Sequence, residues 1–299
     1  MFNNKNILIT GGTGSFGNQF VKMTLKKFNP KKIIIYSRDE MKQWEMSIRY
    51  AKEKKVKFII GDVRDKESLI RASVDVDYLV HAAATKIVPT AELNPFECIK
   101  TNIIGAMNVI EACNYNKVKK IVALSTDKAS SPINLYGATK LASDKLFVSA
   151  NANLNKGTIF SIVRYGNVMG SRGSVLPFFF EKSKKGLIPI TDTRMTRFNI
   201  LMEQCLETVF YAIKNSIGGE MIIPKMPSIR ITDLAHSIKN NKIEIVGIRP
   251  GEKLHEELIS ESDSFNTFDI GKYYVMLPSN YIEYKSKYKK YIKKGKKVK

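Results

Sequence analysis

The chain contains few cysteines and few histidines for its length. Its 299 residues include three of each. Neither set has the spacing of a metal site, so the sequence predicts no bound metal. An odd number of cysteines in a long chain also argues against a disulfide framework and favours reduced thiols in the cytoplasm. The residues concerned are Cys98, Cys113, Cys205, His81, His236 and His255.

Long apolar runs are also absent. No uninterrupted apolar stretch approaches the roughly 18 residues that a membrane-spanning helix needs. The first residues, Met1–Asn6, are polar and lead directly into Ile7–Ile9, so they do not resemble a signal peptide. We therefore expect a cytoplasmic protein without a membrane span.

Acidic residues are scarce compared with basic ones. The chain has 28 Asp and Glu against 49 Lys and Arg, a formal net charge of +21. Nine lysines and one glutamate lie in Tyr281–Lys299. A basic surface can bind nucleic acid, but no nucleic-acid-binding motif accompanies this charge. We interpret Tyr281–Lys299 as a solvated Lys-rich tail and expect no specific nucleic-acid partner. An anionic small-molecule substrate also suits a basic cleft.

Short apolar segments alternate with helix-like segments through the first half of the chain. The apolar segments are rich in Ile and Val, which is typical of buried parallel strands. This alternation predicts an α/β fold with a doubly wound parallel sheet. The expected strands are Asn6–Thr10, Lys32–Tyr36, Val56–Ile60, Tyr78–His81, Ile121–Leu124 and Ile159–Val163, and the expected helices include Phe16–Phe28, Pro95–Tyr115 and Leu135–Ala150.

After Gly166 the alternation ends, and glycine, proline and arginine become frequent. One strong helix candidate, Glu203–Lys214, interrupts this region. Ligands of open α/β sheets bind outside the carboxyl ends of the strands, where we expect a smaller lobe to lie. The predicted division is a main domain of residues 1–167 with 200–223 returning to it, a lobe of 168–199 and 224–280, and the tail 281–299.

A glycine-rich segment follows the first expected strand and opens the first expected helix. Its glycines, Gly11, Gly14 and Gly17, are spaced three apart. Glycine permits a tight turn and a close approach of the backbone to a pyrophosphate, and the helix N-terminus offers free N–H groups to that anion. The strand–turn–helix context predicts a dinucleotide site. The candidate contacts are Gly11, Thr13, Gly14, Ser15, Phe16 and Gly17.

The end of the second strand bears on which dinucleotide binds. Ser37 and Arg38 precede Asp39, whereas an acidic residue directly at the strand end would hold ribose hydroxyls and favour NAD. Arginine suits a 2′-phosphate, so we predict NADP. Arg38 could instead stack on adenine or pair with Asp39. Asp62 could accept from the adenine amino group. The remaining cofactor candidates are Asp62, Val63, Ala82, Ala83, Ala84, Asn102, Ser125, Tyr136, Lys140 and Tyr165.

A Tyr-x-x-x-Lys pair, Tyr136 and Lys140, lies on one face of a predicted helix. A lysine one turn away, together with a nicotinamide cation, would lower the tyrosine pKa and make it a base for a sugar hydroxyl. Asp127 and Lys128 precede Tyr136 by nine and eight residues. An added carboxyl and amine suggest removal of a proton from carbon and expulsion of a leaving group, which is dehydratase chemistry. The alternative for Asp127 and Lys128 is a surface ion pair.

The chain resembles the extended short-chain dehydrogenases/reductases, and among them the inverting UDP-N-acetylglucosamine 4,6-dehydratases, which act early in pseudaminic acid biosynthesis and flagellin glycosylation. The resemblance runs from residue 6 to about residue 258. It is carried by the segments ILITGGTGSFG, IIIYSRDE, FIIGDVRD, HAAATK, NPFECIKTNI, ALSTDKA, NLYGATKLASDKLFVSAN, RYGNVMGSRGSVLPFFF, PITDTRMTRF, TDLAH and IRPGEKLHE.

The resemblance implies a Rossmann fold, a tightly bound and recycled NADP, and a UDP-N-acetylglucosamine substrate inverted at C5. It implies that Tyr136 accepts the 4-hydroxyl proton, Lys128 removes the C5 proton and Asp127 protonates the leaving C6 hydroxyl; Thr126 and Lys140 complete the catalytic set. Which residue returns a proton to C5 is left open. A homo-oligomer, dimer or hexamer, is also implied. The alternatives are a retaining dehydratase, a nucleotide-sugar 4-epimerase and a non-catalytic NADP-binding module.

Candidate substrate contacts lie in the predicted lobe and in the loop after the fourth strand. Arginine matches phosphate geometry with two parallel hydrogen bonds, although each charged candidate could also be a solvated surface residue. Ile87 and Asn199 depart from the family, which usually has histidine and tryptophan there. The substrate candidates are Lys86, Asn167, Ser174, Val175, Thr191, Arg197, Arg249 and Glu252.

Overall fold

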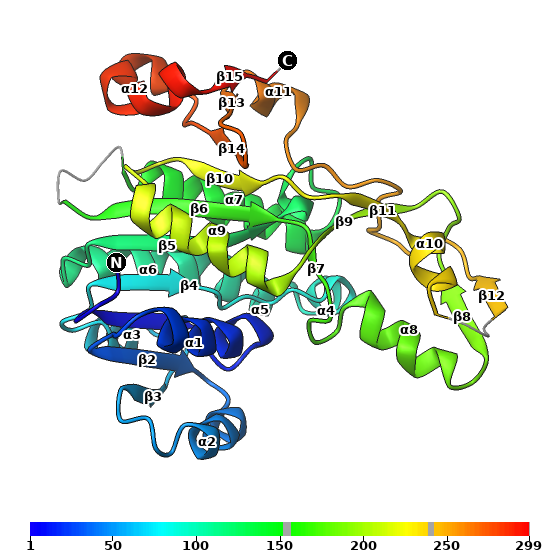
Figure 1. Ribbon diagram of the computed structural model, residues 1–299, viewed down its shortest axis with the longest axis horizontal. Helices are drawn as coiled ribbons and strands as arrows, with labels where there is room; N and C mark the ends of the chain where they lie inside the picture. The colour runs from blue at the N-terminus through cyan, green and yellow to red at the C-terminus, as the bar shows by residue number, and fades with distance from the viewer. Residues whose placement is uncertain (152–156, 239–241, 299) are drawn as a thin grey trace.

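A ten-stranded sheet forms the centre of the molecule in the computed structural model, which describes residues 1–151, 157–238 and 242–298. Its strand order is β15-β13-β14-β10-β6-β5-β4-β1-β2-β3, and helices cover both faces (Figure 1). From β1 the chain adds β2 and β3 on one side, then crosses over and adds β4, β5 and β6 on the other side. This reversal of direction is typical of a doubly wound sheet. The predicted fold class is confirmed.

Seven parallel strands make up the larger part of this sheet, and the six that were predicted are all present. β5 and β6 continue beyond their expected ends, as far as Thr126 and Tyr165. Those extensions place functional candidates at the carboxyl edge of the sheet. The parallel strands are β1 Asn6–Thr10, β2 Lys32–Ser37, β3 Val56–Ile60, β4 Tyr78–His81, β5 Lys120–Thr126, β6 Ile159–Tyr165 and β10 Met221–Pro224.

Two apolar clusters hold the helices on the sheet. One joins α1 and α9 to one face, and the other joins α3, α6 and α7 to the opposite face. The predicted helix Pro95–Tyr115 is divided by a π-helical turn, η1, which places Asn102 inside the fold. The helices of this domain are α1 Ser15–Lys27, α2 Glu40–Arg49, α3 Lys66–Ala72, α4 Val88–Leu93, α5 Pro95–Ile99, η1 Lys100–Ile104, α6 Gly105–Tyr115, α7 Leu135–Ser149 and α9 Met202–Asn215.

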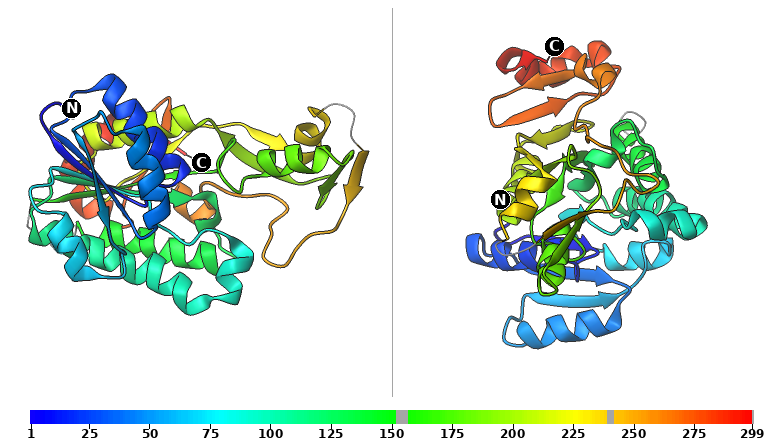
Figure 2. Two further views of the ribbon diagram at one scale, coloured as in Figure 1. Left: turned by 90° about the horizontal axis from the view of Figure 1, so that it is seen from below. Right: turned by 90° about the vertical axis from the view of Figure 1, so that its right-hand side faces the viewer.

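A smaller lobe projects from the carboxyl edge of the parallel strands (Figure 2). It has its own apolar cluster, which includes Phe179, Ile188 and Ile231. The lobe therefore carries a separate small core while remaining continuous with the sheet edge that holds the candidate site. Its elements are β7 Asn167–Val168, α8 Val175–Ser183, β8 Leu187–Ile190, β9 Thr196–Ile200, β11 Ser228–Arg230, α10 Ile231–His236 and β12 Lys242–Ile245.

The residues 267–276 were expected in this lobe but belong to the main sheet instead. β13 (Thr267–Asp269) and β14 (Tyr273–Met276) add antiparallel strands beside β10. The short α11 (Glu261–Ser264) precedes them. Antiparallel strands can close the edge of a parallel sheet, because a short connection suffices where a parallel strand would require a crossover.

The segment 281–298 is not the solvated tail that the sequence suggested. It forms η3 (Tyr281–Tyr284), α12 (Lys285–Lys294) and β15 (Lys296–Lys297), which pairs with β13. Tyr288 and Tyr291 are only 3% exposed. The aromatic residues of α12 thus pack on the core while its lysines face solvent. Lys299 lies outside the described residues.

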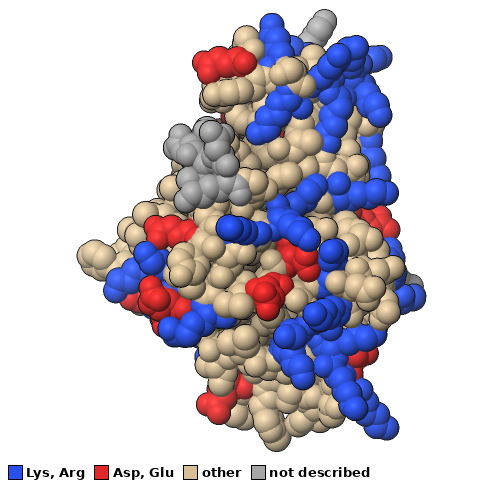
Figure 3. All heavy atoms as spheres, turned by 90° about the vertical axis from the view of Figure 1, so that its left-hand side faces the viewer, with Lys and Arg blue, Asp and Glu red and all other residues tan. Residues whose placement is uncertain are grey.

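Basic side chains are crowded on one face of the molecule (Figure 3). They gather at the top of that view, where α12 lies, and continue down one side. None of the helices in the described part of the chain has both the length and the apolar composition that crossing a membrane requires.

Candidate active site

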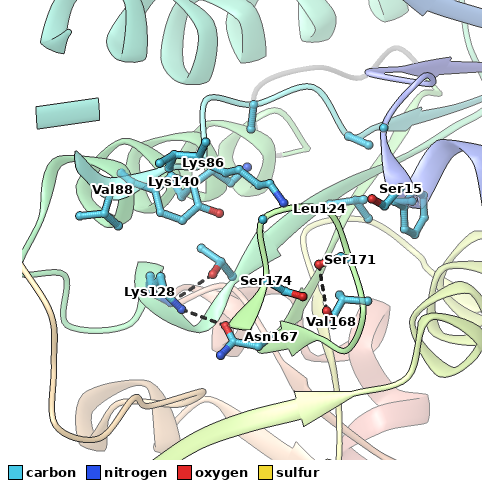
Figure 4. A pocket seen from close by; sticks show the side chains of 18 of the residues that line it. Ser15, Lys86, Val88, Leu124, Lys128, Lys140, Asn167, Val168, Ser171 and Ser174 are labelled. Carbon is cyan, nitrogen blue, oxygen red and sulfur yellow. Dashed lines mark hydrogen bonds between the residues drawn. The ribbon is translucent and has the colours of Figure 1, made fainter. Parts of the chain in front are cut away.

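A cavity of about 790 Å³ opens at the carboxyl edge of the parallel strands, between the main domain and the lobe. Figure 4 shows side chains from both parts pointing into it. All the residues that the sequence predicted for the site line this cavity except Gly17, Asn102 and Asp127. The fold thus brings together three groups of candidates that are far apart in the sequence.

The glycine-rich loop lies at one end of the cavity. Gly11 has φ +65°, and a Cβ there would lie 2.8 Å from the backbone nitrogen of Ala83. A Cβ on Gly17 would lie 2.1 Å from the carbonyl oxygen of Gly12, so Gly17 allows the helix to pack on the loop without itself reaching the cavity. The N-cap residue of α1, Gly14, makes no side-chain capping bond. The amides at that helix end remain available to an anion.

The polar residues at the end of β2 have different hydrogen-bond partners. Ser37 Oγ lies 2.9 Å from Thr13 Oγ1. Asp39 caps α2 by accepting from the Lys42 amide at 3.0 Å, and its carboxylate also pairs with the Lys42 ammonium. Arg38 does not pair with Asp39; its Nη1 lies 3.7 Å from Asp62 Oδ2 and most of its side chain is exposed. The carboxylate of Asp39, the acidic residue nearest to the end of β2, is therefore already bonded to the first turn of α2.

Asp62 is similarly committed to local contacts. Its carboxylate accepts from the Arg64 amide at 3.0 Å and from Arg64 Nη2 at 2.6 Å. Burial opposes the charged form, but these hydrogen bonds and the nearby Arg38 lower the pKa of Asp62 below its usual value. Asp62 therefore stays ionised and anchors the loop after β3, with part of its surface on the cavity.

Two buried residues hold the loop after β4 in place. Thr10 Oγ1 accepts from the amides of Ala82 and Ala83 at 3.2 and 3.3 Å. Asn102, a predicted cofactor contact, does not line the cavity. Its side chain exchanges two hydrogen bonds of 2.9 Å with the backbone of Thr85 and donates to Thr139 at 3.0 Å. Asn102 thus positions the loop after β4 against α7.

The helix α7 presents Tyr136 and Lys140 to the cavity, and a glycine that the sequence argument missed sets their surroundings. Asn134 caps this helix by accepting from the Gly137 amide at 2.8 Å. A Cβ on Gly137 would lie 2.2 Å from the carbonyl oxygen of Lys128. Gly137 therefore allows the turn η2 (Asp127–Ala129) to pack directly on α7.

Asp127 and Lys128 are adjacent but differently placed. Asp127 is 0% exposed, and its Oδ1 accepts from Thr126 Oγ1 at 2.9 Å and from Lys128 Nζ at 3.1 Å. Its Oδ2 is buried without a partner. Lys128 Nζ faces the cavity and also donates to Asn167 Oδ1 at 3.3 Å. This arrangement differs from a surface ion pair, because one partner is fully buried and an acceptor is left unpaired.

The electrostatic state of the Tyr136–Lys140 pair follows from burial. Burial raises the pKa of Tyr136 above its ordinary value, although a hydrogen bond with Thr126 opposes this. Burial also lowers the pKa of Lys140, with Asp144 acting in the opposite sense. Before any ligand binds, Tyr136 is therefore a protonated phenol that can donate a hydrogen bond. Once a cation approaches, the phenol can lose its proton.

Behind Tyr136 and Lys140 lies a buried polar cluster that was not predicted from the sequence. Ser125 Oγ donates to Asp144 Oδ2 at 2.6 Å, and Arg164 Nη2 donates to the same oxygen at 3.2 Å. Arg164 further donates to the Leu258 carbonyl at 3.1 Å. Because Asp144 lies one turn after Lys140, this cluster fixes the inner face of α7. The four-residue spacing from Lys140 is a signal in the sequence that could have indicated Asp144.

The lobe contributes a second helix N-terminus. Ser174 is the N-cap residue of α8, makes no side-chain capping bond, and has a buried Oγ without a partner. Val175 follows it on the cavity wall. An unpaired hydroxyl at a free helix N-terminus can bind an anion such as a phosphate.

Arg197, a predicted substrate contact that lines the cavity, is also hydrogen-bonded to three backbone carbonyls. Its Nη1 donates to the carbonyls of Thr196 and Leu254 at 2.7 and 3.1 Å, and its Nη2 donates to that of Lys253 at 3.0 Å. These bonds hold the loop 249–256 against β9. Part of the Arg197 side chain also lines the cavity. Arg249 and Glu252 form an ion pair with each other on this loop. Thr191, also on the wall, donates to Met195 Sδ at 3.1 Å.

The two departures from the family pattern lie in different places. Ile87 lines the cavity and is 56% exposed. Asn199 is buried in β9, donates to the Arg197 carbonyl at 2.9 Å and does not line the cavity. Only the change at Ile87 therefore touches the site. Among the described residues, no group of His, Cys, Asp and Glu forms a potential metal centre.

Comparisons with known proteins agree with this geometry. A family model described as polysaccharide biosynthesis protein matches residues 7–278. An inverting UDP-N-acetylglucosamine 4,6-dehydratase of Campylobacter jejuni (strain 81-176) is 59% identical over 93% of this chain and 84% of its own. A UDP-glucose 4-epimerase of Rickettsia bellii (strain OSU 85-389) is 44% identical over 92% of this chain and 83% of its own.

A solved structure is also similar along most of its length. The X-ray structure of Pen from Bacillus thuringiensis superimposes with a TM-score of 0.89 and 39% identity, covering 93% of this chain and 90% of that one. Sequence and structure thus agree over the main domain and the lobe. The chain belongs to the polysaccharide biosynthesis protein family, in the group that resembles the inverting UDP-N-acetylglucosamine 4,6-dehydratases.

Proposed function

We propose that this protein is an enzyme that removes water from UDP-N-acetylglucosamine across C5 and C6 and inverts C5. The observation that carries the proposal is the buried Asp127 with an unpaired oxygen, which lies beside Lys128 and behind the cavity that Lys128, Tyr136 and Lys140 line. A simple alcohol oxidoreductase requires only the last two residues. The 59% identity to an inverting UDP-N-acetylglucosamine 4,6-dehydratase supports the same activity.

The cavity suits two diphosphate groups. The N-termini of α1 and α8 both lack side-chain caps and both border it. We assign the α1 terminus to the cofactor diphosphate and the α8 terminus, with Ser174, to the diphosphate of the nucleotide sugar. Asn167 and the loop of Arg249 and Glu252 would then lie along the sugar and the uridine.

We propose a bound nicotinamide dinucleotide, and NADP in particular. The glycine-rich loop and the N-terminus of α1 would hold it, and it would supply reversible hydride transfer with the sugar without being consumed. Asp39, the acidic residue that could hold ribose hydroxyls, is occupied by α2 and Lys42. Ser37 and the exposed Arg38 remain to meet a 2′-phosphate. Calorimetric titration of Arg38→Ala should show about tenfold or greater loss of NADP affinity with little change for NAD.

The chain's own residues then divide the proton transfers. Tyr136 accepts the proton of the 4-hydroxyl, helped by the positive charge of Lys140. The ketone formed at C4 makes the C5 proton acidic, and Lys128 removes it. Asp127, held between Thr126 and Lys128, protonates the C6 hydroxyl so that water leaves. Because the carbonyl forms first, the pKa of the C5 proton falls far enough for a lysine amine to remove it.

Incubation with UDP-N-acetylglucosamine in deuterium oxide tests the proposed function. We expect a 4-keto-6-deoxy product with deuterium at C5 and inverted configuration, seen by NMR. Retained configuration would indicate a retaining dehydratase, and a C4 epimer would indicate the activity named for the Rickettsia bellii relative. An unchanged sugar together with normal NADP binding would indicate a non-catalytic binding module. Asp127→Asn should lower turnover by at least about 100-fold.

We also propose that the protein is a homo-oligomer. The run of helices α4, α5, η1 and α6 exposes several apolar side chains, which supports an interface there. Light scattering after size exclusion should show more than one chain per particle, and Met107→Asp should shift the particle toward the monomer. The exposed apolar residues are Leu93, Phe96, Ile99, Ile104 and Met107.

A further inference from the structure

Two lysine amines enter the cavity from different strands. Lys128 follows β5 and Lys86 follows β4. Figure 4 shows the two side chains entering the pocket from opposite sides, with space between their amines. Both residues line the cavity. Inversion of a carbon centre requires a proton to leave from one face and another to arrive on the other face, so two groups on opposite walls fit that requirement.

The surroundings of the two amines differ in charge. Lys128 Nζ lies 3.1 Å from Asp127 Oδ1 and 3.6 Å from Glu256 Oε1. Lys86 Nζ donates to the Arg172 carbonyl at 3.2 Å, and none of the ion pairs found among the described residues includes it. Partial burial in the cavity wall lowers the pKa of Lys86 below its ordinary value, while part of the side chain stays exposed to solvent. An ammonium with a lowered pKa releases its proton more readily.

The contact of Lys86 is itself held in place. The Arg172 amide donates to Ser15 Oγ at 3.0 Å, which ties the loop after β7 to the start of α1. The Arg172 carbonyl that receives Lys86 is thus fixed relative to the glycine-rich loop. Lys86 therefore contacts the loop between β7 and α8, and that loop is joined to the N-terminus of α1.

We propose that Lys86 is the acid that delivers a proton to C5 of the sugar, on the face opposite to Lys128. The inference rests on the proposed function and assigns a residue to its last step. It also gives a role to a cavity lysine for which no carboxylate partner is found among the described residues.

The electrons and protons balance in this sequence. Lys128 takes the C5 proton, and the electron pair left behind forms the C5–C6 double bond as the C6 hydroxyl leaves with the proton of Asp127. After C6 has gained a hydride, the pair is shared between C5 and the 4-keto oxygen. That pair forms the new C5–H bond with the proton of Lys86. To restore the site, Lys128 passes the proton from C5 to Asp127, which lies 3.1 Å away. Tyr136 releases the 4-hydroxyl proton to water, and the neutral Lys86 amine regains a proton from water.

A single-turnover experiment with Lys86→Met and sugar deuterated at C5 tests the assignment. With enzyme in excess, we expect deuterium to leave C5 at close to the wild-type rate, because Lys128 is intact. Formation of the inverted product should fall by at least about 100-fold, and mass spectrometry of quenched samples should show the unsaturated 4-keto sugar accumulating. Lys86→Arg should behave in the same way, because a guanidinium keeps the charge but does not release its proton.

Several outcomes would overturn the assignment. Inverted product at a rate near that of the wild type in Lys86→Met would do so, as would equal losses of C5 deuterium release and of product. Full rescue by Lys86→Arg would show that only positive charge is needed. Lys100→Met, at an exposed position on η1, is the matched control and should leave every readout unchanged. If the wild-type enzyme itself gives no inverted product, the proposed function fails rather than this assignment.

Discussion

Gly137 lies where two backbone segments of the site meet. Its neighbours in sequence, Tyr136 and Lys140, were recognised from their spacing, but the need for a glycine between them depends on the Lys128 carbonyl packed against it. Single residues in this site therefore fall into two classes. Some carry chemistry that the sequence reveals, and others only permit a close approach that becomes visible in three dimensions.

Gly137→Ala should lower turnover at least about tenfold, because an added Cβ would push the Lys128 backbone away and misplace its amine. The melting temperature should also fall, since the contact is with backbone rather than with a flexible side chain. Steady-state kinetics and thermal unfolding measure the two effects. Ala138→Ser, at an exposed position of the same helix, is the control. Unchanged turnover in Gly137→Ala would contradict the packing argument.

Lys140 should govern the alkaline side of the sugar oxidation step. Burial lowers its pKa below the ordinary lysine value of 10.5. As pH rises through that lowered pKa, Lys140 loses the charge that favours the Tyr136 phenolate, so the rate of nicotinamide reduction in a single turnover should fall below pH 10.5. In Lys140→Arg the decline should move to higher pH, because arginine remains charged. The same alkaline limb in both proteins would exclude this role.

At the scale of elements, the ends of the strands and the loops behind them set the site. β4 ends at His81, whose Nδ1 lies 2.8 Å from Thr10 Oγ1. Since Thr10 also accepts from the amides of Ala82 and Ala83, its own hydrogen is directed to His81 Nδ1. A neutral imidazole with an accepting Nδ1 thus joins β1 to β4 directly beneath the loop that would meet the cofactor.

His81 should make the protein less stable as the pH falls. Burial lowers its pKa from 6.5 to about 3. In the unfolded chain, His81 therefore becomes protonated below pH 6.5. In the folded protein, it stays neutral down to about pH 3. Stability from this group is complete above pH 6.5 and declines by about 1.4 kcal/mol per pH unit below it.

Urea unfolding of His81→Asn measures this linkage, because asparagine keeps an acceptor near the Nδ1 position without titrating. Between about pH 6.5 and about pH 5, the wild type should lose about 2 kcal/mol more unfolding free energy than the variant. His236→Asn, on the exposed end of α10, should follow the wild type. Parallel pH profiles for wild type and His81→Asn would refute the assignment.

At the scale of the whole molecule, the lysine-rich C-terminal segment closes one end of the sheet. Glu220 is fully buried and accepts from the amides of Ile217 and Gly218 at 2.6 and 2.7 Å and from Tyr291 Oη at 2.9 Å. Deleting residues 281–299 to test for nucleic-acid binding would therefore damage the fold, so charge-changing substitutions on the exposed face of α12 are the better probe.

Tyr291→Phe should lower the free energy of unfolding by about 1.5–3 kcal/mol, because it removes a hydrogen bond to a buried carboxylate. Activity per folded molecule should be unchanged, since Tyr291 is not among the residues that line the cavity. Chemical denaturation and turnover measure these two quantities. Tyr284→Phe, at a side chain that is 47% exposed, should have no effect on stability. Equal stability of Tyr291→Phe and wild type would mean that α12 docks without this bond.

The sequence by itself determined six of the seven parallel strands, the glycine-rich loop and the choice of Asp127, Lys128, Tyr136 and Lys140 as catalytic candidates, because these depend on local patterns. Hydrophobic runs, glycine spacing and the Tyr-x-x-x-Lys interval are all readable within a few residues. Only the tertiary structure decided that the side chains of Asn102 and Arg197 form hydrogen bonds with backbone groups, and that α12 packs on the core. Those outcomes depend on partners far away in sequence. A buried donor takes whichever acceptor the fold places beside it, which residue type alone does not specify.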